Sequence, residues 1–309
     1  MKTAGNYSPA LQGALLATLA CIIWSGNFIV ARSAATALPP VMLALLRWAC
    51  ASVVMLPLSL AAFKAHWPHI KQHKGHLLLA SLTGVVIFNT MVYKAGQYTT
   101  AINLALISTT SSPAMSFVLA RIFLKEQITG RRLAGLLICM AGVLLLLSRG
   151  RWQVLATLQF TKGDWWILLG ALMFATYNIV VRKKPASLPP RVYLASTFWL
   201  GTLLLLPWAL VENQQAEPWQ FTPAIGGMVL YLGAGASVIS FFCWNAAITR
   251  LGAARTSLFG NLIPIFASLE AVWLLHEHLS WLHITSMAIV IGGLVLANLP
   301  GSKSAPYRQ

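Results

Sequence analysis

The chain has 309 residues, of which 58% are hydrophobic and only 9% are charged, and its mean hydropathy is +0.71. Soluble domains carry about 25% charged residues, so this composition excludes an ordinary soluble protein. In a soluble chain, the formal charge of +16 would indicate nucleic-acid binding. Here no stretch is both basic and long enough to form a soluble nucleic-acid-binding module. We therefore expect an all-α integral membrane protein, because only helices satisfy the backbone of such apolar runs in lipid.

Apolar runs of 16 to 24 residues follow one another along the whole chain, close to the length of about 20 residues that a transmembrane helix needs. Prolines, polar clusters and basic residues separate the runs, and the first continues into Arg32 without a signal-peptide cleavage site. The runs predict ten transmembrane helices, over 10–31, 41–63, 77–95, 101–123, 133–148, 165–181, 192–211, 224–247, 254–275 and 282–299.

Lysines and arginines are divided unevenly between alternate ends of these runs. If the N-terminus is cytoplasmic, sixteen lie at the inner ends and five at the outer ends, while Arg47 lies within a span. Cytoplasmic loops carry an excess of positive residues. We therefore expect a multi-pass protein with both termini in the cytoplasm.

The second half of the chain repeats the first. At an offset of 150, Leu38-Pro39-Pro40 matches Leu188-Pro189-Pro190, and at an offset of 151, Gly84 matches Gly235 and Pro113 matches Pro264. Each half, 1–150 and 151–309, holds five predicted spans, so the second copy would enter the membrane upside down. Such inverted five-helix repeats are typical of secondary transporters, which bind their substrate near the membrane midplane.

Polar side chains concentrate on the first, third, fourth, sixth, eighth and ninth predicted helices. Polar groups are costly in lipid, so they face either neighbouring helices, as packing contacts, or a polar pathway. The aromatic residues among them suit an apolar solute or a cation over rings, or act as interfacial anchors. The candidates for substrate binding are Asn27, Asn89, Tyr93, Tyr177, Ser240, Trp244 and Asn261.

Two charges and two prolines inside the spans are further candidates. We expect Arg47 to snorkel or to pair with carbonyls or with Glu270, and the alternative is a contact with an anionic substrate. Glu270 is a candidate for proton coupling or cation binding, and the alternative is a solvated carboxylate. Pro113 and Pro264 occupy equivalent positions and predict either static kinks or helix hinges. The helix-end residues Glu126 and Glu277 are expected to cap or to pair.

Short motifs in the first and ninth spans resemble those of the drug/metabolite transporter superfamily, in particular its EamA-type ten-helix exporters. They are Trp24-Ser25-Gly26-Asn27-Phe28 and the stretch from Asn261 through Pro264 to Glu277, although Ile263 and His276 depart from the usual pattern. The resemblance implies a carrier in the bacterial inner membrane with a central cavity. Relatives of this kind export amino acids, other metabolites or toxic cations.

The sequence therefore predicts an inner-membrane exporter of small metabolites, chiefly amino acids or related amphiphilic solutes. The alternatives are an exporter of lipophilic cationic drugs and a membrane-embedded lipid-modifying enzyme. We find no ATPase or hydrolase motif and expect no enzyme activity, cofactor, metal or nucleic-acid partner. The expected partners are the small-molecule substrate and the lipid bilayer, and protons as coupling ions and a homodimer stay open.

Overall fold

The computed structural model describes residues 8–34, 37–98, 101–148, 150–151, 153, 156, 161–275 and 280–299. Within these ranges the side chains of 28–29, 31–34, 101–103, 105–106 and 271–275 are not described.

All regular structure in the described part is helical. Two segments, η1 and η2, are π-helical, and η3 is a short 3₁₀-helix. In chain order the elements are α1 (Pro9–Ala34), α2 (Pro40–Ala65), α3 (Trp67–Gln72), α4 (Lys74–Ser81), η1 (Leu82–Ile87), α5 (Phe88–Gly96), α6 (Ala101–Phe123), α7 (Gly130–Leu147), α9 (Lys162–Arg182), α10 (Pro190–Gln215), α11 (Pro223–Leu230), η2 (Tyr231–Ile239), α12 (Ser240–Leu251), α13 (Ala253–Leu258), η3 (Phe259–Leu262), α14 (Ile263–Leu275) and α15 (Trp281–Asn298).

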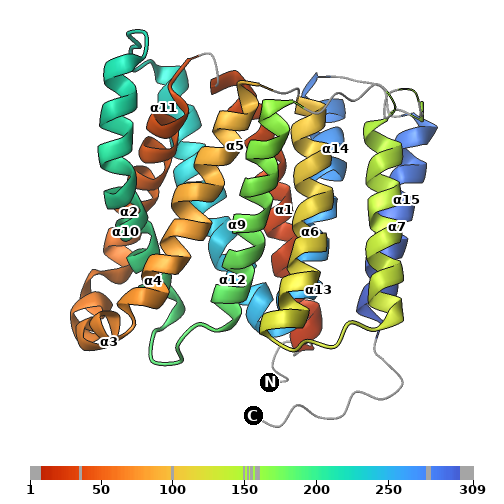
Figure 1. Cartoon of the computed structure of the whole chain (residues 1–309), viewed down its shortest axis with the longest axis horizontal. Helices are drawn as coiled ribbons and strands as arrows, with labels where there is room; N and C mark the ends of the chain where they lie inside the picture. Colours follow the sequence, from red (N-terminus) through yellow and green to blue (C-terminus); the bar gives the residue numbers. More distant parts are fainter. Residues whose placement is uncertain are drawn as a thin grey trace, which may run out of the picture.

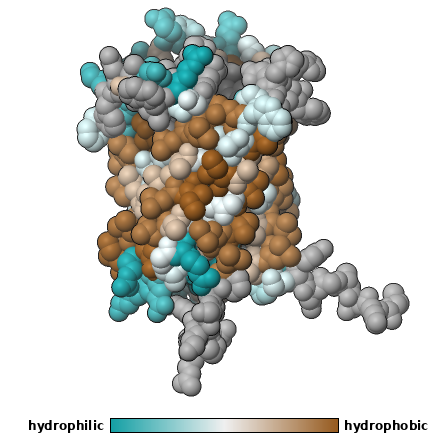
Figure 2. All heavy atoms as spheres, turned by 90° about the vertical axis from the view of Figure 1, so that its right-hand side faces the viewer, coloured by the Kyte–Doolittle hydropathy of each residue, from teal (hydrophilic) through white to brown (hydrophobic). Residues whose placement is uncertain are grey.

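The protein is an all-α membrane protein. Among the described residues, eight helical segments are long and apolar enough to cross a bilayer. Figure 2 shows the matching surface, a hydrophobic belt between two more hydrophilic ends. Every predicted apolar run overlaps a helix, with ends that differ by a few residues. The expected loop at 64–76 contains the short helix α3, and its Pro68 is tolerated because the first turn needs no N–H donor.

Helix boundaries follow from local chemistry. Pro40 and Pro190 begin α2 and α10, where a fixed φ and a missing N–H cost nothing. Thr161 caps the N-terminus of α9, and its backbone N–H donates to Asp164 Oδ2 at 2.6 Å. Gly252 ends α12 with a φ of 91°, a conformation that favours glycine.

The helices form one bundle in which partners come from opposite halves of the chain. The most extensive packing pairs α7 with α15, α2 with α10, α6 with α9, and α1 with α12. The α7–α15 pair stands at one edge of the bundle in Figure 1, and α1 begins on the side where α15 ends. Gly293 permits the close approach of that pair, because a Cβ there would lie 2.8 Å from Cys139 Sγ.

Candidate functional site

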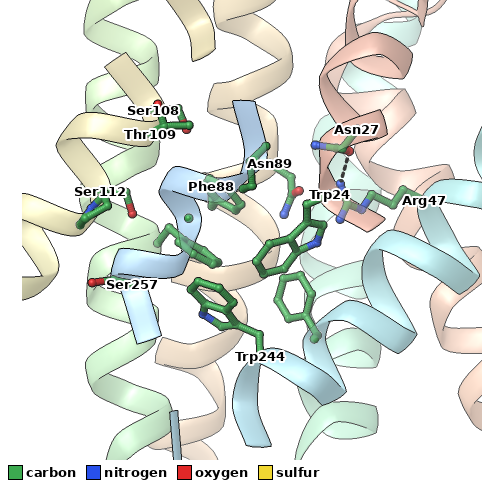
Figure 3. A pocket seen from close by; sticks show the side chains of 15 residues that line it. Trp24, Asn27, Arg47, Phe88, Asn89, Ser108, Thr109, Ser112, Trp244 and Ser257 are labelled. Atoms are coloured by element: carbon green, nitrogen blue, oxygen red, sulfur yellow. Dashed lines mark hydrogen bonds between the residues drawn. The ribbon is translucent and has the colours of Figure 1, made fainter. Parts of the chain in front are cut away.

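A small cavity lies in the middle of the bundle and is lined from both halves of the chain (Figure 3). Its volume is about 70 Å³, room for a few water molecules. A larger solute therefore requires the surrounding helices to move apart. The lining residues are Trp24, Asn27, Arg47, Phe88, Asn89, Ser108, Thr109, Ser112, Pro113, Phe174, Phe241, Trp244, Ser257, Gly260 and Ile263.

Aromatic rings form one wall of this cavity. The Trp24 ring lies 5.0 Å from Trp244, 5.7 Å from Phe174 and 5.8 Å from Phe241 between centroids. Phe88 extends the wall, with its centroid 4.7 Å from that of Phe174. These edge-on and tilted contacts are the favoured geometries for aromatic pairs, and they leave an apolar surface for a solute.

Hydrogen bonds fix the two indole rings of this wall. Trp244 Nε1 donates to Asn178 Oδ1 at 2.9 Å, and Asn178 Nδ2 in turn donates to Ser116 Oγ at 3.2 Å. Trp24 Nε1 donates to the carbonyl of Ala236 at 2.8 Å. The polar atom of each indole is thus satisfied outside the cavity, so the apolar part of each ring can line it.

Arg47 lies at one end of the cavity and is 2% exposed. Its guanidinium donates to Ser237 Oγ at 2.7 Å, to Tyr93 Oη at 2.9 Å, and to Asn27 Oδ1 and the Ala236 carbonyl at 3.1 Å each. All of these partners are neutral. The expected pairing with a carbonyl is present, whereas no ion pair with Glu270 forms among the described residues.

Asn89 serves both the cavity and the backbone. Its Nδ2 donates to the carbonyls of Gly84 and Val85 at 3.2 Å each. These carbonyls belong to the π-helical segment η1, whose backbone hydrogen bonds depart from the α-helical pattern. The side-chain oxygen Oδ1 remains as an acceptor beside the cavity that Asn89 lines.

The model of the EamA-like transporter family matches residues 11–148 and again residues 161–299. The chain belongs to this family. Its fold and its membrane-spanning helices are therefore those of a membrane transporter.

Relatives of this EamA-like chain are transporters as well. An uncharacterised transporter of Archaeoglobus fulgidus is 29% identical over 287 residues, which is 91% of this chain and 96% of the relative. A protein of Salmonella typhimurium named as a probable amino-acid metabolite efflux pump is 23% identical, over 91% of this chain and 93% of its own. A solved crystal structure that is 20% identical shares the fold with a TM-score of 0.72, covering 95% of this chain and 97% of that one.

Several residues predicted from the sequence line the cavity of this transporter, and others stand behind it. Asn27, Asn89, Trp244, Arg47 and Pro113 are in the lining. The remaining candidates for substrate binding are buried against protein and are not in the lining, and these are Tyr93, Tyr177, Ser240 and Asn261.

These buried residues have identifiable partners. Tyr93 supports Arg47, and Tyr177 Oη donates to Asn245 Oδ1 at 3.0 Å. Ser240 Oγ donates to the Gly235 carbonyl at 3.1 Å. Asn261 Nδ2 donates to the Leu258 carbonyl at 2.9 Å, while its buried Oδ1 has no partner within the described part of the chain.

Glu270 and the two prolines differ in their surroundings. Glu270 is half-buried on α14 outside the cavity lining, and its Oε1 accepts a hydrogen bond from Ser25 Oγ at 2.5 Å. Pro113 lies within the continuous helix α6, whereas Pro264 follows the 3₁₀ segment η3, where the ninth predicted span changes helix type. Such a change inside a helix often marks a hinge.

Residues at the helix ends are described only in part. Glu126 Oε1 accepts the backbone N–H of Ala253 at 3.1 Å, which confirms the expected capping role. Glu277 and its neighbours His276 and His278 lie outside the described residues.

Sequence reasoning missed three rings of the aromatic wall, Phe88, Phe174 and Phe241. The sequence could have indicated Phe174, because it lies 150 positions after Trp24, at the offset of the repeat. Phenylalanine is so common in apolar runs that the other two carry no signal of their own.

Proposed function

We propose that this protein is an inner-membrane secondary transporter that exports small metabolites, chiefly amino acids or related amphiphilic solutes, by alternating access. The observation that carries the proposal is the cavity lined from both halves of the chain, with a charged polar end and an aromatic wall. Pockets that bind small molecules combine an apolar lining with a few placed polar groups in this way. The amino-acid assignment is also supported by the named activity of the Salmonella typhimurium relative.

The proposed architecture is ten spans in two inverted repeats, 1–150 and 151–309. Matched π-helical segments support it, because η1 (Leu82–Ile87) overlaps η2 (Tyr231–Ile239) when shifted by 151. Matched hydrogen bonds support it too. Asn89 donates to the Gly84 carbonyl, and its counterpart Ser240 donates to the Gly235 carbonyl, each five residues earlier. The same unusual bond at equivalent positions of the two halves is what an internal repeat would produce.

Direct contacts between counterparts support a two-fold relation through the cavity. Ser52 Oγ and Thr202 Oγ1, which are 150 positions apart, lie at 3.1 Å. Trp24 and Phe174 are also 150 apart, and their rings are in contact. Residues related by a two-fold axis touch one another only beside that axis. Trp24 and Phe174 also line the cavity, and a cavity beside the two-fold axis is where rocking of the two halves would alternate access.

We assign the direct solute contacts to Asn27, Asn89, Trp244 and Arg47, because these side chains line the cavity. Tyr93, Tyr177, Ser240 and Asn261 would act indirectly, by holding the backbone and Arg47 in position. Pro113 would serve as the hinge of α6, and Pro264 would serve as the hinge of α14. Glu270 would couple transport to protons.

Counterflow in proteoliposomes tests the proposal. Liposomes that hold purified protein are loaded with an unlabelled amino acid, and uptake of the same labelled amino acid is followed over a panel of side chains. We expect transient, saturable accumulation for at least one large apolar amino acid, and none in protein-free liposomes. Absence of counterflow over the whole panel, with cationic dyes and other small metabolites included, would contradict a transporter of this class.

A further inference from the structure

Arg47 carries a buried positive charge, and its hydrogen-bond partners among the described residues are all neutral. Its side chain bridges α1, α5 and η2 through hydroxyl, amide and carbonyl oxygens, and it makes no ion pair among the described residues. Buried charges in proteins are usually paired, since taking an ion out of water is expensive. Arg47 also lines the cavity, so a negatively charged solute could supply the missing counter-charge.

One N–H group of the Arg47 guanidinium has no hydrogen-bond partner among the described residues. Arginine offers five N–H groups, and four hydrogen bonds to protein are present. The four bonds hold the planar group still, which favours recognition of a carboxylate, because less motion is lost on binding. Among the described residues of the lining, Arg47 alone is formally charged, and its charge is positive.

The other lining residues indicate which chemical groups the rest of the solute carries. Asn89 lies on α5 one turn before Tyr93, which accepts a hydrogen bond from Arg47. Asn89 Nδ2 donates to the backbone, so Oδ1 can accept from an ammonium group. The aromatic wall begins next to this end, and the hydroxyls of Ser108, Ser112 and Ser257 lie on the far side (Figure 3). This order fits a small molecule with a carboxylate head, an aromatic or large apolar body and an optional polar tip.

We infer that the cavity recognises a monocarboxylate with an aromatic or bulky apolar body, and that Arg47 is the residue that selects for the carboxylate. The inference rests on the proposed transport function and narrows it. A neighbouring ammonium group is accepted at Asn89 but is not required. Amines and amides of the same shape bind more weakly, because they bring no counter-charge to the buried guanidinium.

Arg47 could instead hold α1, α5 and η2 together without touching a solute, and the experiment separates these roles. Four probes of one shape are compared by isothermal titration calorimetry on nanodisc-embedded protein at pH 7: L-phenylalanine, 3-phenylpropionate, L-phenylalaninamide and phenethylamine. The two carboxylates should bind at least about tenfold tighter than the amide and the amine, the usual difference when a charge-assisted hydrogen bond is lost.

Variants then assign the preference to one side chain. Arg47→Gln should weaken 3-phenylpropionate binding by about 10- to 100-fold. It should leave the weak binding of L-phenylalaninamide within about threefold, the spread expected when no charge-assisted bond is lost. The matched control is Arg191→Gln, which removes the same charge from an exposed residue outside the cavity and should change no affinity. If Arg47→Gln does not fold, Arg47→Lys keeps a positive charge but removes the planar guanidinium, and it should show a smaller loss of the same sign.

The outcomes separate the inference from the proposed function. Equal binding of acids and amides by the unaltered protein overturns the inference, and so does an Arg47→Gln loss that is the same for both. Absence of binding by all four probes overturns it as well. The transport function is judged independently, by counterflow over the wider panel of solutes.

Discussion

At the scale of single residues, the charges inside the membrane region have separate partners. Arg47 belongs to the cavity, while Glu270 is bound by the Ser25 hydroxyl on the neighbouring helix α1. Ser25 and Asn27, which hold one charge each, are two residues apart on that helix. Movement of α1 would therefore change the surroundings of both charges, which is the arrangement that coupling requires.

Glu270→Gln tests whether Glu270 couples transport to protons. The substitution keeps an acceptor for Ser25 Oγ but removes the group that can gain and lose a proton. We expect gradient-driven transport to lose its dependence on the pH gradient, while counterflow, which needs no coupling ion, is retained. Both are measured in the same proteoliposomes, with the exposed Glu217→Gln as the matched control. An unchanged response to the pH gradient would exclude Glu270 as the coupling group.

The residue types of the site could be predicted from the sequence, but the directions in which the side chains point could not. Asn89, Arg47 and Trp244 were identifiable because polar and charged groups inside apolar runs must have partners. Whether a side chain meets the cavity or the backbone depends on packing between the halves. Ser240 and Asn89 are counterparts with the same backbone bond, yet only Asn89 lines the cavity.

At the scale of elements, the π-helical segments are what position the site. A π turn shifts the following residues around the helix axis, so η1 sets the direction of Phe88 and Asn89, and η2 sets that of Phe241 and Trp244. The helices could be predicted from apolar runs and prolines. The π segments could not, because they depend on side chains that reach back to carbonyls, and hydropathy does not reveal such bonds.

Removing those side-chain bonds should have different effects in the two halves. Asn89→Ala leaves the Gly84 and Val85 carbonyls without this donor, and Ser240→Ala does the same to Gly235. Each variant should lose about 1–3 kcal/mol of stability, the cost of an unsatisfied buried group. Only Asn89→Ala should also weaken solute affinity, since Asn89 lines the cavity.

Thermal unfolding and counterflow measured together distinguish these effects. Thr176→Ala is a suitable control, because this exposed hydroxyl bonds the carbonyl four residues earlier on the regular helix α9. It should change neither quantity. Equal affinity losses in Asn89→Ala and Ser240→Ala would contradict the assignment of Ser240 to a purely supporting role.

At the scale of the whole molecule, contacts between helix ends define two faces. On one face, the start of α2 meets the ends of α5 and α10, where Glu212 accepts the backbone N–H groups of Val41 and Met42 at 2.7 and 3.1 Å. The other face joins Glu126 to Ala253. A carboxylate at a helix N-terminus is favoured by the helix dipole, so each face has an acidic cap of this kind.

The charge distribution predicts which face is cytoplasmic. With the termini inside, sixteen lysines and arginines lie at the cytoplasmic ends and five at the outer ends, a bias that orients membrane proteins. Reporter fusions after Lys71, Ser187 and Gly252 should therefore be active only with a cytoplasmic reporter such as green fluorescent protein. Fusions after Pro40, Ala101 and Gln215 should be active only with alkaline phosphatase, which needs the periplasm. Testing both reporters at every site supplies the control, because each site must be positive with one and negative with the other. If all six sites gave the opposite result, the termini would be periplasmic, the cap at Glu212 would face the cytoplasm, and the proposed orientation would be wrong.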